Sequence, residues 1–415
     1  MEESIGIDVY LTKEEGIKGK IKENPEDFCV EELPIYPKPS KGKHVVARIK
    51  SKNWETNKLI EQLAKSMKIS SKAIGYAGIK DKRAVTLQLM TFASPIKKVL
   101  NTRIRDVEIE PLYITNKPIT HGMLIGNKFK IWIRNVENIH QFYKILKEIE
   151  SYGGFPNFFG IQRFGIARPI THVVGKYLLD NDIEKAVMTY VAEPFEGEDE
   201  ESYKARKFLK ETRDFEEALK IYPKKLNFER RIIEHLAKNP NDWENAIKKL
   251  PSNLVRIFIH AYQSYIFNRI LSARIKKGLP INEAIIGDIV VKDLNSSEGV
   301  YVNEKNIEKI NKEVKKGKCF PTGAIIGYAT KIAKGEMGEI EQGIMEEENI
   351  DTSKFKMPYM PWLASPGMRR SLFVPLKRIV WKIEGDNIFV QFFLPKGCYA
   401  TSLLREFMKA DIYSY

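Results

Sequence analysis

Hydrophobic and polar residues follow short, regular patterns in the first third of the chain. Residues 44–50 (HVVARIK) and 126–136 (GNKFKIWIRNV) place apolar side chains at every second position, which predicts two half-buried strands. Between them, residues 56–67 (TNKLIEQLAKSM) have apolar side chains at helical spacing, with Thr56 as the expected N-cap. Residues 73–79 (AIGYAGI) form a continuous apolar run and predict a buried strand. This part of the chain is therefore expected to be mixed.

Longer helical patterns dominate the middle of the chain. Residues 172–191, 205–222 and 253–278 all repeat apolar side chains at the spacing of one helical face. The segment 193–201 holds six acids between the first two patterns, and a solvated, mobile loop is expected there. The middle of the chain thus predicts a largely helical domain.

Strand patterns return in the last third. Residues 285–291 and 323–332 are apolar and short, and residues 387–395 (NIFVQFFLP) precede a turn and the expected helix 401–410. Mixed elements, then helices, then strands again predict an α+β fold in which one domain is inserted into another.

Composition and charge narrow the range of functions. The chain has 415 residues, enough for two or three domains, and its net charge is +14 with a pI near 9.3. Residues 33–83 contain thirteen Lys or Arg and three acids. So concentrated a positive charge favours a polyanionic partner such as a nucleic acid.

Several classes of protein are made less plausible by what the sequence lacks. Three dispersed cysteines and six histidines without ligand spacing indicate neither a disulfide framework nor a metal centre. The sequence contains neither a phosphate-binding G-x-x-x-x-G-K-[ST] motif nor a G-x-G-x-x-G motif. No apolar run approaches the roughly 18 residues needed to span a bilayer. A cytoplasmic protein that needs no metal is therefore expected.

One acid lies inside a cationic run in residues 75–88 (GYAGIKDKRAVTLQ). Asp81 follows Lys80 and precedes Lys82 and Arg83, at the end of an expected strand. Neighbouring cations favour the ionised form of a carboxyl group, which suits a nucleophile or a group that stabilises positive charge on a sugar. The alternative is an ordinary charged turn in which the acid bonds to nearby backbone groups.

Two further segments carry aromatic and polar residues together. Residues 157–165 (NFFGIQRFG) combine three Phe with Asn, Gln and Arg, which would suit either core packing or the stacking of an extruded base. Residues 22–32 (KENPEDFCVEE) place Lys22 and Phe28 around a Pro-initiated turn, and a plain loop before a strand is the alternative there.

Together with residues 394–406 (LPKGCYATSLLRE), these segments resemble the TruD family of tRNA pseudouridine synthases in their order and separation. The resemblance implies a pseudouridine synthase fold with a curved, mixed or antiparallel sheet and helices, plus a large inserted α-rich α/β domain. The implied parts are a catalytic domain in residues 1–174 and 373–415, and an inserted TRUD domain in residues 175–372. It also implies isomerisation of uridine to pseudouridine in tRNA, typically at position 13 in the D arm, without cofactor or metal.

The resemblance also assigns roles to single residues. It matches Asp81 to the essential aspartate, Lys22 to the basic residue near it, and Phe159 to the ring that stacks on the target uracil. The other expected substrate-binding residues are Phe28, Lys80, Asn157, Arg163 and Tyr399, the last of which is often Phe in the family. Contacts to the RNA backbone are expected from Lys41, Lys43, Arg48, Lys50, Lys52 and Arg83.

The sequence leaves the mechanism open. Asp81 could attack the anomeric carbon of the sugar, attack carbon 6 of the ring, or remove a sugar proton to form a glycal. A non-catalytic RNA-binding or RNA-chaperone protein is the alternative function, and a different RNA-modifying enzyme such as a methyltransferase would depend on a cofactor.

Overall fold

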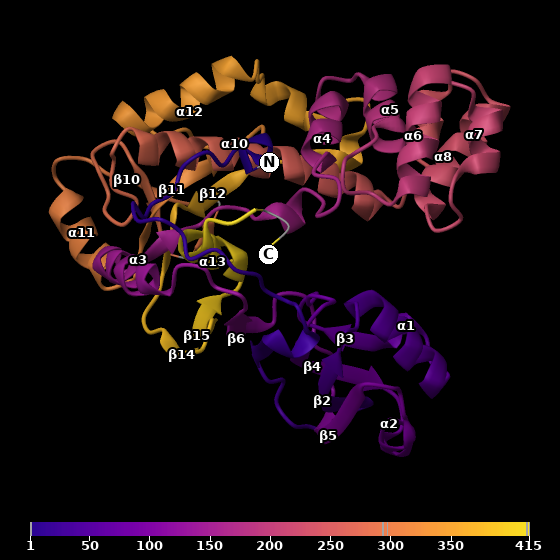
Figure 1. Ribbon diagram of the computed structural model, residues 1–415, viewed down its shortest axis with the longest axis horizontal. Helices are drawn as coiled ribbons and strands as arrows, with labels where there is room; N and C mark the ends of the chain where they lie inside the picture. The colour runs from indigo at the N-terminus through magenta and orange to yellow at the C-terminus, as the bar shows by residue number, and fades with distance from the viewer. Residues whose placement is uncertain (1, 293, 297, 412–413, 415) are drawn as a thin grey trace. The chain divides into compact units, whose positions relative to one another are not determined.

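The computed structural model describes the whole chain except residues 1, 293, 297, 412, 413 and 415. The chain forms two compact units (Figure 1). We call Met1–Leu11 with Pro156–Phe373 the helical unit, and Thr12–Phe155 with Val374–Tyr415 the sheet unit. The chain passes between them after Leu11 and within two short paired strands, β7 (Gly154–Pro156) and β13 (Phe373–Pro375).

These units differ from the expected domains 1–174, 175–372 and 373–415 in two segments. Residues 2–11 belong to the helical unit because helix α10 (Ser252–Lys276) holds them: Asn268 Nδ2 donates to the carbonyl of Ile5 at 2.9 Å. Residues 156–174 also belong to the helical unit. The assignment of a catalytic and an inserted domain stays a prediction.

The sheet unit is built on an eight-stranded mixed sheet. The parallel pair β1–β4 lies near its centre, and the other adjacent strands pair in an antiparallel manner. The order is β14 (Val380–Glu384), β15 (Asn387–Pro395), β6 (Leu124–Ile133), β1 (Phe28–Pro34), β4 (Val85–Ala93), β2 (His44–Lys52) and β5 (Val107–Thr115), with β3 (Ile74–Tyr76) paired to β4. The predicted alternation is confirmed in β6, whose Phe129, Ile131 and Ile133 are buried, and in the second half of β2; in its first half Val46 is also buried, against a second core on the opposite face.

Three helices cover one face of this sheet. α3 (Ile139–Tyr152) and α13 (Ala400–Met408) pack against β1, β6 and β15, and α1 (Thr56–Met67) packs over β2 and β4 (Figure 1). The expected N-cap of α1 is wrong: Glu55 caps the helix by accepting the backbone N–H groups of Asn57 and Lys58. The hydroxyl of Thr56 is used elsewhere, as described below. A short helix, α2 (Ile96–Asn101), follows β4.

The helical unit contains nine α-helices within the described residues. They are α4 (Thr171–Leu179), α5 (Ile183–Ala192), α6 (Glu200–Thr212), α7 (Phe215–Ile221), α8 (Asn227–Lys238), α9 (Trp243–Ile247), α10, α11 (Ile307–Lys315) and α12 (Gly335–Glu347). A five-stranded sheet in the order β10 (Val300–Tyr301), β8 (Ile289–Val291), β11 (Phe320–Ile325), β12 (Met368–Ser371) and β9 (Asn295–Ser296) completes the unit. The pattern in residues 172–191 divides into α4 and α5 because Asn181 has a φ of 59° and Asp182 caps the second helix. The predicted α+β class is confirmed.

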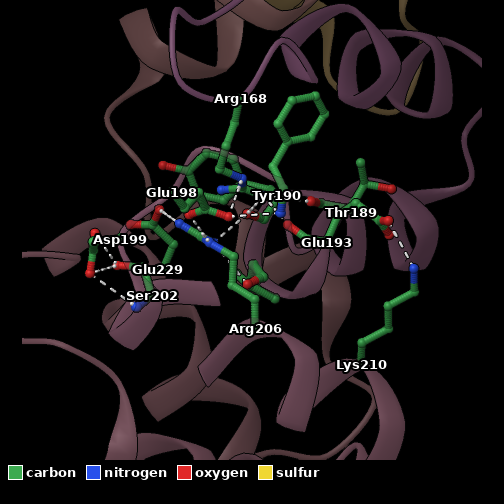
Figure 2. A network of polar contacts seen from close by, with 12 residues as sticks. Arg168, Thr189, Tyr190, Glu193, Glu198, Asp199, Ser202, Arg206, Lys210 and Glu229 are labelled. Atoms are coloured by element: carbon green, nitrogen blue, oxygen red, sulfur yellow. Dashed lines mark hydrogen bonds and ion pairs between the residues drawn. The ribbon is translucent and has the colours of Figure 1, made fainter. Parts of the chain in front are cut away.

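The acidic segment 193–201 is only partly the solvated loop that its composition predicts: most of its acids are exposed, but Glu198 is not. The carboxylate of Glu198 is buried and lies 2.9 Å from Arg206 Nε and 3.4 Å from Arg168 Nε (Figure 2). Arg206 also binds Glu229 at 2.9 Å, and Asp199 caps α6. Two buried arginines therefore hold the segment in place, and sequence composition cannot show such pairing. Within the described residues, no helix is long and apolar enough to cross a membrane.

Candidate active site

Asp81 lies in the irregular segment 77–84, between β3 and β4 of the sheet unit. Its closest cation is Lys22, 59 positions earlier in the chain, whose Nζ donates to Asp81 Oδ1 at 3.2 Å. Lys82 and Arg83, the cations that follow Asp81, are exposed. The tertiary fold, and not the local run of cations, thus supplies the positive charge that contacts this carboxylate.

Lys22 is held in a defined position. Its backbone adopts a left-handed conformation with φ of 59°, and its Nζ lies 4.4 Å from the centre of the Phe28 ring. The Lys22 side chain is only 11% exposed, against 37% for that of Asp81. Phe28 itself is buried in the core of the sheet unit, and its ring stabilises the ammonium group by a cation–π contact.

The turn between Lys22 and Phe28 is fixed by a second acid. Asp27 accepts hydrogen bonds from the Arg134 guanidinium and from the backbone N–H of Asn24. Burial raises the pKa of Asp27, but these bonds outweigh it and hold the pKa below its usual value. The ionised Asp27 therefore keeps the 3₁₀ turn Pro25–Asp27 in place beside β6.

Lys80 points into the core and not toward solvent. Its Nζ lies 2.7 Å from Glu32 Oε2, outside hydrogen-bond geometry, and donates to Asn127 Oδ1 at 2.8 Å. Its side chain is 5% exposed and that of Glu32 is 0% exposed. Glu32 and Asn127 are direct partners across β1 and β6. Because the Lys80 backbone N–H also donates to Thr56 Oγ1 at 2.8 Å, three elements fix the residue next to Asp81.

The buried position of Lys80 argues against direct contact with a substrate. Lys22, Phe28, Lys80 and Asp81 are close neighbours within the sheet unit. Tyr399, also of this unit, is half-buried and directly precedes α13.

Asn157, Phe159 and Arg163 form a second group, in the helical unit. The Asn157 side chain is buried: its Nδ2 donates to the carbonyl of Ser371 at 2.9 Å and its Oδ1 accepts from Arg370 at 2.6 Å. The Arg370 guanidinium also lies 4.0 Å from the centre of the Phe159 ring. Arg163 donates from Nε to Ser264 Oγ at 3.1 Å and lies 5.7 Å from the same ring.

The backbone of Phe159 is clamped by one amide side chain. Asn268 Oδ1 accepts the Phe159 N–H at 2.9 Å, and Asn268 Nδ2 donates to the Phe159 carbonyl at 3.0 Å. Asn268 and Arg370 were not predicted from the sequence. The only sequence signal for Asn268 is that it is a polar residue within an apolar helix. The only signal for Arg370 is that it belongs to a pair of arginines shortly after a glycine. Such patterns do not reveal a partner that is 109 or 213 positions away.

The residues expected to contact the RNA backbone divide into two groups. Arg48 pairs with Glu110 at 2.9 Å, Lys50 with Glu108 at 2.8 Å, and Lys52 with Glu26. Lys41, Lys43 and Arg83 are exposed and pair with no acid in the part of the chain that the structure describes. The described residues also contain no group of three or more His, Cys, Asp or Glu side chains that could hold a metal ion.

Comparison with known proteins decides the family. The family model described as tRNA pseudouridine synthase D (TruD) matches residues 4–407. The chain belongs to the TruD family. A Methanococcoides burtonii protein named "Probable tRNA pseudouridine synthase D" is 41% identical over 431 residues, which cover 99% of this chain and 98% of that protein. A Thermococcus sibiricus protein of the same name is 41% identical over 412 residues, covering 96% of this chain and 97% of its own.

A solved TruD structure has the same fold. The crystal structure of a Methanosarcina mazei protein described as "Putative tRNA pseudouridine synthase D (TruD)" superposes with a TM-score of 0.85 at 37% identity, covering 100% of this chain and 98% of that one. The resemblance of the four sequence segments to the TruD family is therefore confirmed, and so is the fold that it implied.

Proposed function

We propose that Asp81 is the reacting carboxylate of this TruD-family tRNA pseudouridine synthase, and that its target is the uridine at position 13 in the D arm. The chain is an isomerase of a family that acts on tRNA. The observation that carries the assignment to Asp81 is its ion pair with Lys22 at the entrance to β4.

The reaction defines what the site must supply. The bond between N1 of uracil and C1′ of the ribose breaks, the base turns, and a bond forms between C5 and C1′. A proton leaves C5 and a proton is taken up at N1, so atoms and electrons balance without an oxidant or reductant. The protein must therefore provide an ionised carboxylate, a place for the detached base, and groups that move protons.

Asp81 has the geometry for the first requirement. Lys22 engages Oδ1, while Oδ2 has no hydrogen-bond partner among the described residues. The side chain is 37% exposed and so can reach a substrate. A cation that holds one oxygen orients the carboxylate, whichever of the three routes Asp81 takes.

The aromatic residues provide for the base. Extruding a uridine costs a few kcal/mol, and stacking on an aromatic ring returns roughly 1 to 3 kcal/mol per base. We assign this stacking to Phe159, whose backbone Asn268 clamps on both sides; the residue is 6% exposed and the centre of its ring lies 4.0 Å from the Arg370 guanidinium, so stacking requires that Arg370 move off the ring. Asn157, Arg163, Phe28 and Tyr399 remain proposed contributors to the base pocket.

Lys80 takes a different role from the one expected. Because its ammonium group is buried against Glu32 and Asn127, we assign it to positioning Asp81 and not to contact with RNA. Function without cofactor or metal and a cytoplasmic location remain proposals that the same chemistry favours.

The test is turnover on an unmodified tRNA transcript. Purified protein in buffer, with no added cofactor, should convert a single uridine in the D arm, and a transcript with cytidine at position 13 should give no product. Pseudouridine at another position would contradict the proposed target. Tight binding without any product would favour the non-catalytic RNA-binding alternative.

A further inference from the structure

Three segments of the chain adjoin the same end of three neighbouring strands in the sheet unit. β2 begins at His44, and His44 is the direct partner of Ala93, where β4 ends, and of Thr115, where β5 ends. The segments next to these residues therefore gather at one end of three adjacent strands, where α2 also lies (Figure 1). Six exposed lysines occupy them. We call this group the lysine end: Lys38, Lys41, Lys43, Lys97, Lys98 and Lys117.

The lysine end is free of acids. Residues 34–43, 94–104 and 115–123 contain no Asp or Glu. Within the described chain, none of the six lysines forms an ion pair. The middle of the same sheet is different, because Lys50 and Arg48 there are neutralised by Glu108 and Glu110 on β5. Positive charge is thus left uncompensated at the lysine end, unlike in the middle of the sheet.

The lysine end has a defined backbone. Ser40 N–H donates to the carbonyl of Ile114 at 3.0 Å, and Asn116 N–H donates to Ser40 Oγ at 2.9 Å. Thr115 Oγ1 donates to the carbonyl of Lys38 at 2.9 Å. A cavity of about 340 Å³ beside it is lined by Lys43 and by apolar atoms of Ile96 and Ile114, among others. The lysines therefore project from a fixed scaffold and can match a fixed array of charges.

The lysine end is remote from Asp81 within the unit. Asp81 precedes the start of β4 at Val85, and the lysine end adjoins the end of β4 at Ala93. Eight steps of about 3.3 Å along a strand place the two ends of β4 roughly 26 Å apart. The lysine end therefore adjoins the end of β4 that is farther along the strand from Asp81.

We propose that the lysine end binds backbone phosphates of the tRNA body, outside the arm that carries the target uridine. The inference rests on the proposed function, because Asp81 marks where the target lies. Lysine ammonium groups contact phosphates as point charges and read no base, so they select a tRNA by the position of its backbone. Each phosphate that they neutralise releases counterions, which makes the affinity depend on salt.

Binding measurements test this without turnover. The variant Lys41→Gln/Lys43→Gln/Lys97→Gln removes three charges, and Lys204→Gln/Lys207→Gln/Lys220→Gln removes three exposed lysines that already pair with acids. For full-length tRNA, the first variant should lower the slope of log K against log salt by about two to three and weaken binding at least about tenfold. The control should leave both values unchanged, and both variants should keep the wild-type melting temperature.

A separate RNA stem–loop that consists of the D arm with the same uridine distinguishes binding to the D arm from binding to the rest of the tRNA. Its binding should be the same for the wild-type protein and the lysine-end variant. Hydroxyl-radical footprints on full-length tRNA should lose protection outside the D arm only. An unchanged salt slope, or lost protection within the D arm, would overturn the proposal. Turnover by Asp81→Asn would instead defeat the proposed function and leave these binding results as they stand.

Discussion

Replacing Lys80 by Met tests the role of the buried pair that precedes Asp81. Methionine has nearly the length of lysine but no charge, so Lys80→Met removes the ammonium group and leaves space almost unchanged. The Glu32 carboxylate, 0% exposed, then keeps only the backbone N–H of Leu89, at 3.3 Å, as a described hydrogen-bond donor. Asn127 also loses the donor to its Oδ1.

The expected cost follows from the burial of both groups. Removing one partner of a buried ion pair typically destabilises a protein by about 3–5 kcal/mol, because an uncompensated charge stays behind. Replacing the whole pair by neutral groups of similar size is often nearly neutral. For a domain of this size, 1 kcal/mol changes the melting temperature by about 2–4 °C, so Lys80→Met should lower it by roughly 6–20 °C.

The assay is a double-mutant cycle with a kinetic readout. Lys80→Met, Glu32→Gln and the double variant are unfolded in urea, and the same proteins are assayed for turnover and tRNA affinity. We expect the double variant to recover most of the stability. Its kcat should stay at least about tenfold below wild type, because only the backbone bond to Thr56 then holds the residue next to Asp81, while its Kd for tRNA should be unchanged.

Three results would refute this reasoning. A loss below about 1 kcal/mol in Lys80→Met would mean that the pair is not buried as described. A double variant with wild-type kcat would mean that Lys80 serves stability alone. Weaker tRNA binding with a smaller salt slope in Lys80→Met would mean that Lys80 contacts the RNA directly.

Buried polar contacts elsewhere give three more predictions. Asn268→Leu removes both bonds to the backbone of Phe159 and should lower stability by about 2–4 kcal/mol in urea unfolding and reduce kcat. Burial lowers the pKa of His172 to about 4, so the unfolded chain binds more protons between pH 4 and 6.5, and stability falls as pH drops through this window. Between pH 7 and pH 4, the free energy of unfolding should fall by about 3 kcal/mol less in His172→Phe than in the wild-type protein, as measured by unfolding curves at both pH values. Arg206→Met leaves two buried carboxylates without this cation and should lower the free energy of unfolding by about 3–5 kcal/mol. Removing the exposed ion pair of Arg213 should lower it by at most about 1 kcal/mol.

The sequence predicted the regular elements well because their periods are local. The alternation in residues 44–50 and the helical spacing in 56–67 both depend on side chains that face one core. The motif segments also identified Asp81 and Lys22, which lie 3.2 Å apart in the structure. These signals need no knowledge of long-range contacts.

The sequence failed where a side chain finds its partner far along the chain. The cationic run predicts Lys80 as a substrate contact, since nothing local shows that Glu32 and Asn127 lie against its ammonium group. For the same reason, the composition of residues 193–201 does not show that Glu198 is buried against Arg206. The sequence predicts Thr56 as a helix cap, but its hydroxyl accepts the N–H of Lys80 instead.

The sequence also does not show which lysines of the sheet unit pair with acids. Lys50 and Lys41 are alike in sequence, yet Lys50 faces an acid on the neighbouring strand and Lys41 does not. Strand register decides this difference, and register depends on the pairing of segments that the sequence alone does not align.

The central assignment is tested most directly by measuring pseudouridine formation and tRNA binding in Asp81→Asn, beside the control Asp106→Asn. Amide and carboxylate have nearly the same shape, so the substitution removes the charge that Lys22 contacts and little else. We predict that Asp81→Asn binds tRNA with wild-type affinity and forms no product in a single turnover, while Asp106→Asn stays active. Product formation by Asp81→Asn at a measurable rate would contradict the assignment of Asp81 as the reacting group.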